Sequence, residues 1–252
     1  MTLSAVLSIS SAFPPIEMYG LSNRQIKTLL KILSARKDGL AQVKLFGSRA
    51  RGDYKKFSDV DLAIKFLRPI QSQLAADFDG ANFPYTTDII DLSTASENLL
   101  RNIERDGKLL FVSDGRKIFM TLEQIKLKHE DFSRALKKLH TALEEDITAN
   151  ELFLDGLIQR FEFCFELSWK LMKAFLDYEG IEVNSPRSAI RKAFQTELIA
   201  DAETWLDMLE KRSLSSHTYD AETALEIYRH VAQKYIFLFD DFAATIKDKF
   251  SD

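Results

Sequence analysis

Glycine and proline are distributed unevenly along this chain of 252 residues, and that distribution constrains the fold more than any other feature. The second half holds only two glycines, Gly156 and Gly180, and one proline, Pro186. Both residue types interrupt regular structure, so a long stretch that almost lacks them favours a series of helices. We predict two domains: residues 1–115 form a small domain of helices and strands, and residues 116–252 form an antiparallel helical bundle.

The first half alternates helix and strand signals. Ser22 and Gln25 form the pattern of a capping box before a helix that Gly39 closes. The remaining expected elements are strands over 42–46, 58–66, 86–92 and 109–112 and a helix over 96–107. Residues 68–82 give no clear signal, and residues 112–117 are predicted to be the linker between the domains. The pattern indicates an α+β fold in which a small mixed sheet precedes the bundle.

The second half consists of long amphipathic stretches. They predict helices over 120–147, 150–179, 186–197, 201–212 and 220–247. The third of these begins with Ser185 as its N-cap and Pro186 at its first helical position. Phe161, Phe165 and Trp169 are spaced four residues apart, as expected for one apolar stripe that faces the bundle core.

Composition narrows the class of protein. The net charge of −4 and the pI of about 5.7 argue against a non-specific nucleic-acid binder. The single cysteine, Cys164, lies among phenylalanines, as expected for a buried thiol in a reducing compartment. No basic residue precedes Arg24, and no apolar run approaches the roughly 20 residues that span a bilayer. We therefore expect a cytoplasmic protein with no membrane partner.

Two acids in one strand carry the clearest chemistry. Asp59 and Asp61 are two residues apart, so on a strand their carboxylates point to the same side and repel each other. Carboxylate oxygens at this spacing suit Mg²⁺, which would also remove the repulsion. Upstream, Gly47 allows a close approach to the backbone, and Ser48 offers a hydroxyl near a helix N-terminus that favours phosphate oxygens.

Additional charged residues complete the predicted site. Arg49 and Arg51 follow Ser48 and are candidates for binding the same phosphates. A third carboxylate is expected from the strand over 86–92, which carries Asp88 and Asp91 on opposite faces. We favour Asp88, which would orient an attacking hydroxyl or accept its proton, and Asp91 is the alternative.

Gly47-Ser48, ten further residues and then Asp59-x-Asp61 resemble the signature of the polymerase-β-like nucleotidyltransferase superfamily, in particular its minimal prokaryotic branch. The resemblance covers roughly residues 19–111. It implies two Mg²⁺ ions held by Asp59 and Asp61 and a nucleoside triphosphate, expected to be ATP, bound by Gly47 and Ser48. We expect Asp88 to be the third metal ligand. The resemblance also implies that an acceptor hydroxyl attacks the α-phosphate in line and that pyrophosphate leaves.

Arg212, His217 and Tyr219 form an Arg-x4-His-x-Tyr pattern near a helix end. The pattern resembles the motif of HEPN domains, in which Arg and His serve metal-independent RNA cleavage, and residues 120–245 resemble nucleotidyltransferase substrate-binding proteins. A histidine can act as general acid or base near neutral pH, and an arginine can stabilise a charged phosphate. Ser213 departs from the family, which commonly has Asn there, and this counts against ribonuclease activity.

Three hypotheses follow. The first is a Mg²⁺-dependent nucleotidyltransferase whose bundle binds the hydroxyl acceptor or supplies it at Tyr219, as in toxin–antitoxin pairs where AMP on that tyrosine silences the ribonuclease. The second is a HEPN-type ribonuclease that the nucleotidyltransferase half regulates. The third is a non-catalytic assembly module, which the intact acids and Gly47-Ser48 disfavour. The HEPN resemblance also implies a homodimer through the bundle. RNA is not a favoured partner. The identity of the acceptor and the choice between adenine and guanine in the nucleotide stay open.

Overall fold

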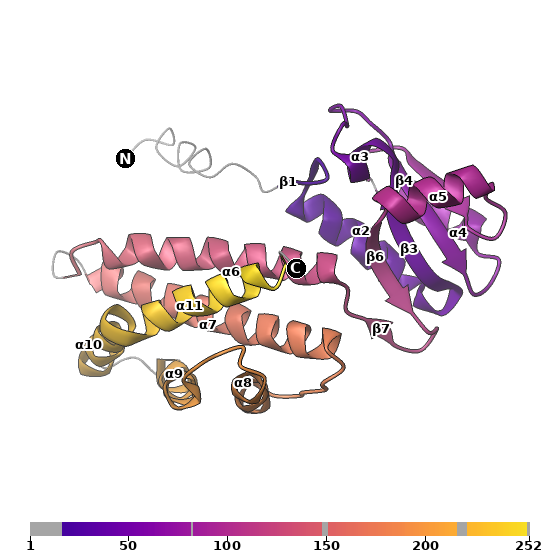
Figure 1. Ribbon diagram of the computed structural model, residues 1–252. Helices are drawn as coiled ribbons and strands as arrows, with labels where there is room; N and C mark the ends of the chain where they lie inside the picture. Colours follow the sequence, from indigo (N-terminus) through magenta and orange to yellow (C-terminus); the bar gives the residue numbers. More distant parts are fainter. Residues whose placement is uncertain (1–16, 82, 148–150, 216–220, 251–252) are drawn as a thin grey trace, which may run out of the picture. The chain divides into compact units, whose positions relative to one another are not determined.

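The computed structural model describes residues 17–81, 83–147, 151–215 and 221–250 (Figure 1). The chain divides into two compact units, residues 1–123 and residues 124–252, and each is described here by itself. Within the described residues, no helix combines the length and the apolar character needed to cross a membrane.

The first unit is built on a mixed sheet of five strands in the order β5-β4-β3-β6-β7. Its strands are β3 (Leu40–Phe46), β4 (Val60–Phe66), β5 (Thr87–Asp91), β6 (Lys108–Ser113) and β7 (Ile118–Phe119). β4 and β5 are parallel, and the other neighbours are antiparallel. A short hairpin of β1 (Glu17–Met18) and β2 (Leu21–Ser22) precedes the sheet. The α+β class predicted from the sequence is confirmed.

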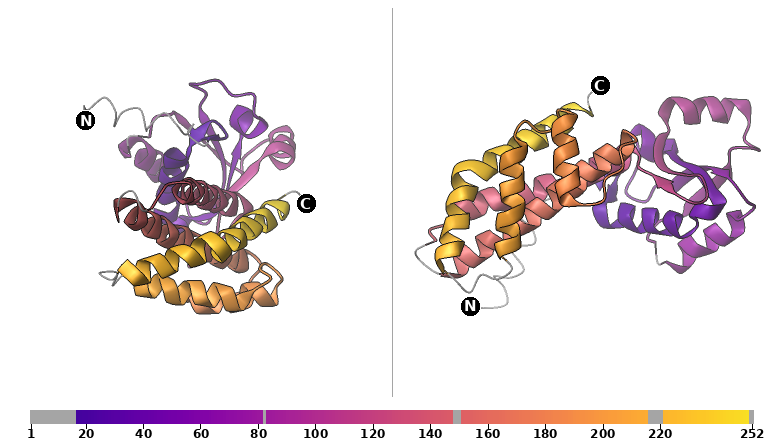
Figure 2. Two further views of the ribbon diagram at one scale, coloured as in Figure 1. Left: turned by 90° about the vertical axis from the view of Figure 1, so that its left-hand side faces the viewer. Right: turned by 90° about the horizontal axis from the view of Figure 1, so that it is seen from below.

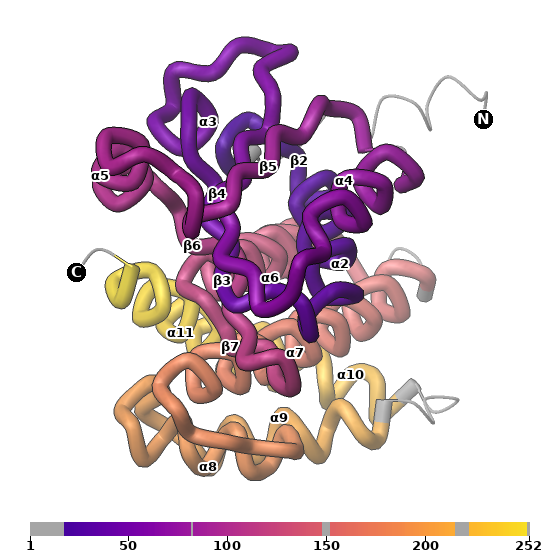
Figure 3. The backbone as a smooth tube through the Cα atoms, turned by 90° about the vertical axis from the view of Figure 1, so that its right-hand side faces the viewer, coloured from indigo at the N-terminus to yellow at the C-terminus, as the bar shows by residue number. Residues whose placement is uncertain are grey.

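Helices cover both faces of this sheet. They are α2 (Asn23–Ala35), α3 (Gly47–Arg51), α4 (Gln71–Gly80) and α5 (Glu97–Asp106), with a 3-10 turn at Lys37–Gly39. Figure 3 shows α2 and α4 on one face of the sheet and α5 on the other. The capping box of Ser22 and Gln25 forms as predicted. Within α4 only Leu74 and Phe78 are buried, so the segment left unassigned from the sequence has few apolar positions from which a helix could be recognised.

The second unit is helical throughout its described residues. Its elements are α6 (Leu122–Leu143), α7 (Glu151–Tyr178), α8 (Pro186–Gln195), α9 (Ala202–Ser215), α10 (Ala221–His230), a π-helical turn (Val231–Tyr235) and α11 (Ile236–Asp248). The five predicted helices are confirmed to within a few residues, except that a π-helical turn divides the last one. Figure 2 shows the helices packed side by side. His129 Nε2 lies 2.9 Å from the Ala243 carbonyl oxygen and joins α6 to α11.

Aromatic side chains fill the core of this bundle. Phe161 and Phe165 are fully buried, as predicted, and Phe161 stacks on Tyr235 with ring centroids 5.6 Å apart. Trp169 is only partly buried, and its indole Nε1 donates a hydrogen bond to a carboxylate at the edge of the core. Burial raises the pKa of the Cys164 thiol, which keeps it protonated and unreactive, in agreement with a structural cysteine.

Residues 112–117 form the end of β6 and the turn that leads into β7. β6 continues through Ser113, and the chain turns back into β7 through Gly115, whose φ is +89°. Asp114 Oδ1 accepts hydrogen bonds from the backbone N–H groups of Arg116 and Lys117, at 2.8 and 2.7 Å. The Asp-Gly turn therefore closes a hairpin where a linker was expected, and the compact units divide after Glu123.

Candidate active site

Gly47 brings the backbone against one of the two acids. It has a φ of +70° and follows directly on β3, whose last residue, Phe46, lies opposite Asp61 in the sheet. A Cβ atom at Gly47 would lie 2.1 Å from Asp61 Oδ2, which is far inside van der Waals contact. Any other residue would push the carboxylate away and strain the backbone, so glycine is required at this point.

The sheet register gathers the three expected carboxylates. Asp59 precedes β4 by one residue, and Asp61 lies directly beside Asp88 of the parallel strand β5. Asp91 pairs with Ile64, so it lies on the opposite face of the sheet and three residues further along β5. Its Oδ1 accepts the backbone N–H of the residue two positions on, at 2.8 Å. The structure therefore brings Asp59, Asp61 and Asp88 to one end of the sheet and excludes Asp91 from that group.

Burial and the negative charge of this group both raise the pKa of Asp61. Its partial burial raises the pKa of the carboxyl, and the negative charges of Asp88 and Asp59 raise it further. Arg49 and Arg51 oppose this rise but do not cancel it. A carboxylate that burial and two neighbouring acids disfavour is stabilised when a cation binds beside it.

The donor set suits a divalent cation but is not fully assembled. Among the residues that the structure describes, no three His, Cys, Asp or Glu side chains are grouped closely enough to hold a metal ion as they stand. Asp59 and Asp88 are exposed, so their side chains have room to turn. The hard oxygen donors and the raised pKa of Asp61 together fit a magnesium site.

Arg49 is directed away from the solvent and into the protein. Its side chain is 1% exposed. The guanidinium donates hydrogen bonds to the carbonyl oxygens of Ser58, Asp59, Tyr19 and Gly20, at 2.7 to 3.1 Å. It also lies over two aromatic rings, 4.2 Å from the centroid of Tyr85 and 5.6 Å from that of Tyr54. These contacts differ from the expected phosphate contact, because a guanidinium that backbone carbonyls surround has little room for an anion.

Ser48 and Arg51 are the accessible members of the predicted phosphate-binding set. The Ser48 carbonyl accepts the N–H groups of Gly52 and Asp53, which closes the short helix α3. Its hydroxyl makes no hydrogen bond with any residue in the described part of the chain. Arg51 is exposed and contacts Asp53 across a 3.2 Å ion pair. Both side chains can therefore meet a ligand at the end of the sheet without breaking a buried contact.

The second predicted site is only partly described. Arg212 lies on α9, and its Nη2 is 3.2 Å from Glu166 Oε1 on α7. Glu166 Oε2 also accepts the indole N–H of Trp169 at 3.1 Å and lies 3.2 Å from Lys170 Nζ. His217 and Tyr219 lie outside the described residues. The sequence indicates the pair of Glu166 and Lys170, because they are four residues apart on one helix. The contact between Glu166 and Arg212 depends on how α7 and α9 pack, so no local pattern in the sequence indicates it.

Each of the two units matches a known protein family. Residues 27–116 match the polymerase beta nucleotidyltransferase family, and residues 127–248 match the family described as nucleotidyltransferase substrate binding protein like. The chain joins a domain that matches the polymerase beta nucleotidyltransferase family to a domain that matches the nucleotidyltransferase substrate-binding family. The carboxylates and Gly47 lie in the nucleotidyltransferase domain, and Arg212 lies in the substrate-binding domain.

Two curated relatives come from Haemophilus influenzae. The probable ribonuclease HepT is 34% identical over 86 residues, which cover 32% of this chain and 59% of the relative. The probable protein adenylyltransferase MntA is 36% identical over 64 residues, which cover 24% of this chain and 56% of the relative. The chain thus spans somewhat more than half the length of each. A crystal structure of a Thermus thermophilus protein is 33% identical, with 46% of this chain and 98% of that chain covered and a TM-score of 0.43.

Proposed function

We propose that this chain transfers a nucleoside monophosphate, AMP from ATP, onto a hydroxyl group that the substrate-binding domain binds or supplies. The observation that carries the proposal is the position of Asp61, which lies against Gly47 and beside Asp88 while Asp59 precedes the same strand. Three carboxylates thus lie at one end of the sheet, where Gly47 leaves room for the Asp61 carboxylate. The match to the polymerase beta nucleotidyltransferase family supports it.

The residues divide into three roles. Asp59, Asp61 and Asp88 would hold Mg²⁺, which when bound offsets their charge and that of the triphosphate. Asp88 is exposed to an incoming acceptor, so its carboxylate would orient the hydroxyl and take its proton. The Ser48 hydroxyl and the Arg51 guanidinium would bind triphosphate oxygens. Arg49 would act as a positioning residue, because it fixes the backbone of Ser58 and Asp59 from inside the protein.

The proposal for the acceptor hydroxyl comes from the proteins that the second domain resembles. One relative is named as an adenylyltransferase of proteins and the other as a ribonuclease, and this chain matches both. We propose that Tyr219 of this chain is the acceptor hydroxyl, which makes the protein a fused counterpart of a toxin–antitoxin pair. An AMP on Tyr219 would add a bulky anion two residues from His217. We also propose that the chain forms a homodimer through the substrate-binding domain.

Ribonuclease activity is the second candidate function. Arg212 favours it, because its side chain is partly exposed at the end of α9, immediately before the segment that holds His217. In this proposal His217 exchanges a proton with the ribose or the leaving group, and Arg212 stabilises the charged phosphate. The nucleotidyltransferase domain would then regulate the cleavage.

The decisive experiment uses the full chain with ATP labelled at the α-phosphate and with Mg²⁺. We expect label on the protein, at Tyr219 by mass spectrometry, and its loss in the variant Asp59→Asn, Asp61→Asn. Asp91→Asn is the matched control, because this acid lies on the other face of the sheet, and it should keep the activity. If no label reaches the chain or any acceptor in a cell extract, the transferase proposal is wrong.

The same preparations separate the second function. RNA cleavage by the full chain should persist in the presence of EDTA and should disappear in Arg212→Ala and His217→Ala. If the unlabelled chain leaves RNA intact and its expression does not slow cell growth, the ribonuclease proposal fails while the transferase proposal is unaffected.

A further inference from the structure

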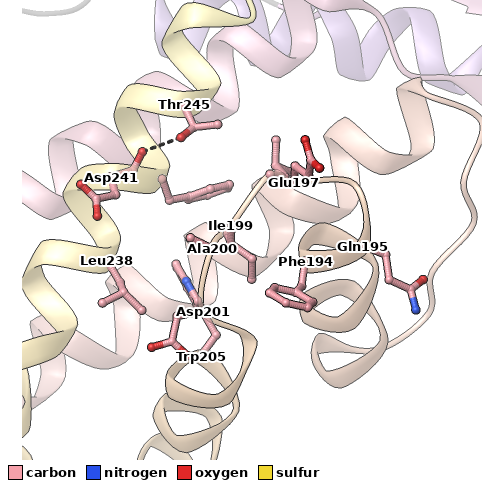
Figure 4. Close-up of a pocket in the computed structure, with 12 residues that line it drawn as sticks. Phe194, Gln195, Glu197, Ile199, Ala200, Asp201, Trp205, Leu238, Asp241 and Thr245 are labelled. Atoms are coloured by element: carbon pink, nitrogen blue, oxygen red, sulfur yellow. Dashed lines mark hydrogen bonds between the residues drawn. The ribbon is translucent and has the colours of Figure 1, made fainter.

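The substrate-binding domain contains a cavity that none of the expected roles uses. Its volume is about 630 Å³, within the range of small-molecule sites, and it lies between the end of α8, the start of α9 and one side of α11. Figure 4 shows its lining, in which Leu238 and Asp241 of α11 face Phe194 and Glu197 across the opening. The cavity lies wholly within the second compact unit.

The floor of the cavity is apolar. Trp205 and Phe242 are almost completely buried beneath it, and their rings meet edge to face with centroids 5.7 Å apart. Phe194 keeps 48% of its surface exposed and Ile199 is buried, so the wall offers both an exposed ring and a fixed aliphatic surface. Such a lining accepts a flat or branched hydrocarbon group and excludes water from it.

The rim carries only negative charge. The lining contains the carboxylates of Glu197, Asp201 and Asp241, and none of the described residues that line it is lysine, arginine or histidine. Thr204 donates two hydrogen bonds to Asp201, from its backbone N–H at 2.9 Å and from its hydroxyl at 2.6 Å, and they lower the pKa of this carboxyl and keep it ionised. Lys234 also lowers that pKa through its charge, but it does not line the cavity.

The position of Glu197 adds to the negative rim. It has a φ of +57° and follows the end of α8, a backbone position that glycine usually occupies. Its N–H donates to the Phe194 carbonyl at 3.1 Å, so the turn is closed and its exposed side chain is displayed beside the opening. Asp241 is also exposed, and its carboxylate makes no hydrogen bond or ion pair within the described part of the chain. Both acids therefore remain available to a ligand.

We propose that this cavity binds a small organic ammonium ion that carries an aromatic ring. The ring would occupy the apolar floor above Trp205 and Phe242, and the ammonium group would lie at the rim between Asp241 and the carboxylates of the α8–α9 connection. Charge complementarity selects this class, because an anion would meet three carboxylates and a neutral molecule would leave Glu197 and Asp241 without a countercharge. The proposal concerns the substrate-binding domain alone and does not depend on nucleotide transfer.

The test uses the full chain and the cation 2-phenylethylammonium, with 2-phenylethanol and phenylacetate as neutral and anionic analogues of similar shape. The chain has two tryptophans, and their indole N–H signals in a ¹H–¹⁵N spectrum can be assigned with the Trp169→Phe variant. We expect the cation to shift the Trp205 signal saturably and to leave the Trp169 signal in place. Both analogues should bind at least ten-fold more weakly.

Two variants test the geometry. Asp241→Asn should weaken the binding of the cation at least three-fold, and Asp248→Asn, an exposed acid on the same helix outside the cavity, should leave it unchanged. Ala200→Trp should fill the cavity and abolish binding. Equal binding of the cation and 2-phenylethanol overturns the proposal, and so does the absence of a saturable shift or full binding by Asp241→Asn. Labelling with ATP is measured separately, so the two proposals can fail independently.

Discussion

Arg49 and Arg212 are both predicted from the sequence to contact a phosphate group, but in the structure Arg49 is buried and Arg212 is partly exposed. Arg49 is 1% exposed, and the acceptors around it are neutral backbone carbonyls. The Arg212 side chain is 38% exposed and is ion-paired with Glu166, whose side chain is 28% exposed. An arginine among buried carbonyls serves the fold, because moving it would leave those carbonyls without partners. An arginine that is itself partly exposed and is paired with a partly exposed carboxylate can exchange that partner for a phosphate more easily.

The Arg49 contacts explain how the nucleotidyltransferase site keeps its shape. The guanidinium joins the loop that carries Asp59 to the turn at Tyr19 and Gly20, which are about forty positions away in the sequence. The Tyr85 ring covers it at 4.2 Å, from the segment that leads into β5. One side chain thus links the segments before both acid-bearing strands. In the substrate-binding domain, the ion pair of Arg212 with Glu166 joins α9 to α7.

Removing Arg49 should produce the largest effect on stability. Arg49→Ala leaves several partly buried carbonyl oxygens without their donor and opens a cavity between Tyr54 and Tyr85, so we expect a loss of about 3 kcal/mol in the free energy of unfolding. Urea unfolding followed by circular dichroism measures this loss. Arg51→Ala is the matched control and should cost less than about 0.5 kcal/mol, because that side chain is exposed. Equal losses in the two variants would remove the distinction between a scaffold arginine and a surface arginine.

The second prediction concerns the two glycines that flank α3. Gly47→Ala should reduce nucleotide transfer by about 100-fold, because the new Cβ would displace Asp61 Oδ2, only 2.1 Å away. Gly52→Ala is a close control: its φ is +90°, so it bears similar backbone strain of about 1–2 kcal/mol, but no described atom lies within 4 Å of the new Cβ. It should keep most of the activity. Transfer rates at saturating ATP separate the two, and similar losses would show that strain alone matters at this turn.

Much of the nucleotidyltransferase site could be predicted from the sequence because its signals are local. The alternation around Asp59 and Asp61 sets the strand and its face, and the register then follows from a strand that ends immediately before Gly47. The two-residue period of a strand predicts that Asp88 and Asp91 lie on opposite faces, and the observed pairing places Asp88 beside Asp61.

Other features depend on packing that no local pattern contains. Arg49 and Arg51 are two residues apart in a short helix, so they point about 200° apart around its axis and cannot both face one anion. From the sequence both arginines are predicted to bind the same phosphates, and only the fold shows that Arg49 points into the protein. The link between Glu166 and Arg212 arises where α7 and α9 meet, 46 positions apart in the sequence. The hairpin through Gly115 has the same composition as a flexible linker, so its strand partner decides the outcome.

The third prediction uses the pH dependence of Asp61. Its pKa in the folded protein is raised by burial and by Asp88 and Asp59, so the folded state binds this proton more tightly than the unfolded state does. Stability should therefore fall as the pH rises from the ordinary Asp pKa of about 3.9 through the raised value. Asp61→Asn removes this loss and should raise the melting temperature at pH 7, with the difference from the wild type vanishing near pH 3.

Mg²⁺ provides the check on that interpretation. Adding it at pH 7 should raise the melting temperature of the wild type and should have a smaller effect on Asp61→Asn, because the variant has one carboxylate fewer to bind the ion. Asp91→Asn serves as the control and should respond to Mg²⁺ as the wild type does. If Asp61→Asn is no more stable than the wild type at pH 7, the repulsion among the three acids has no effect on folding.

The smallest effect is expected at Arg212, where the comparison between the two arginines can be tested most directly. A double-mutant cycle of Arg212→Gln and Glu166→Gln should give a coupling of about 0.5 kcal/mol, because both side chains are partly exposed and Glu166 also contacts Lys170. The cycle of Arg187 and Glu210, which are 3.6 Å apart and more exposed, should give nearly zero. Urea unfolding at low salt measures both. A coupling of about 2 kcal/mol or more would mean that Arg212 is as firmly held as Arg49, and an arginine held in that way is poorly suited to binding a phosphate.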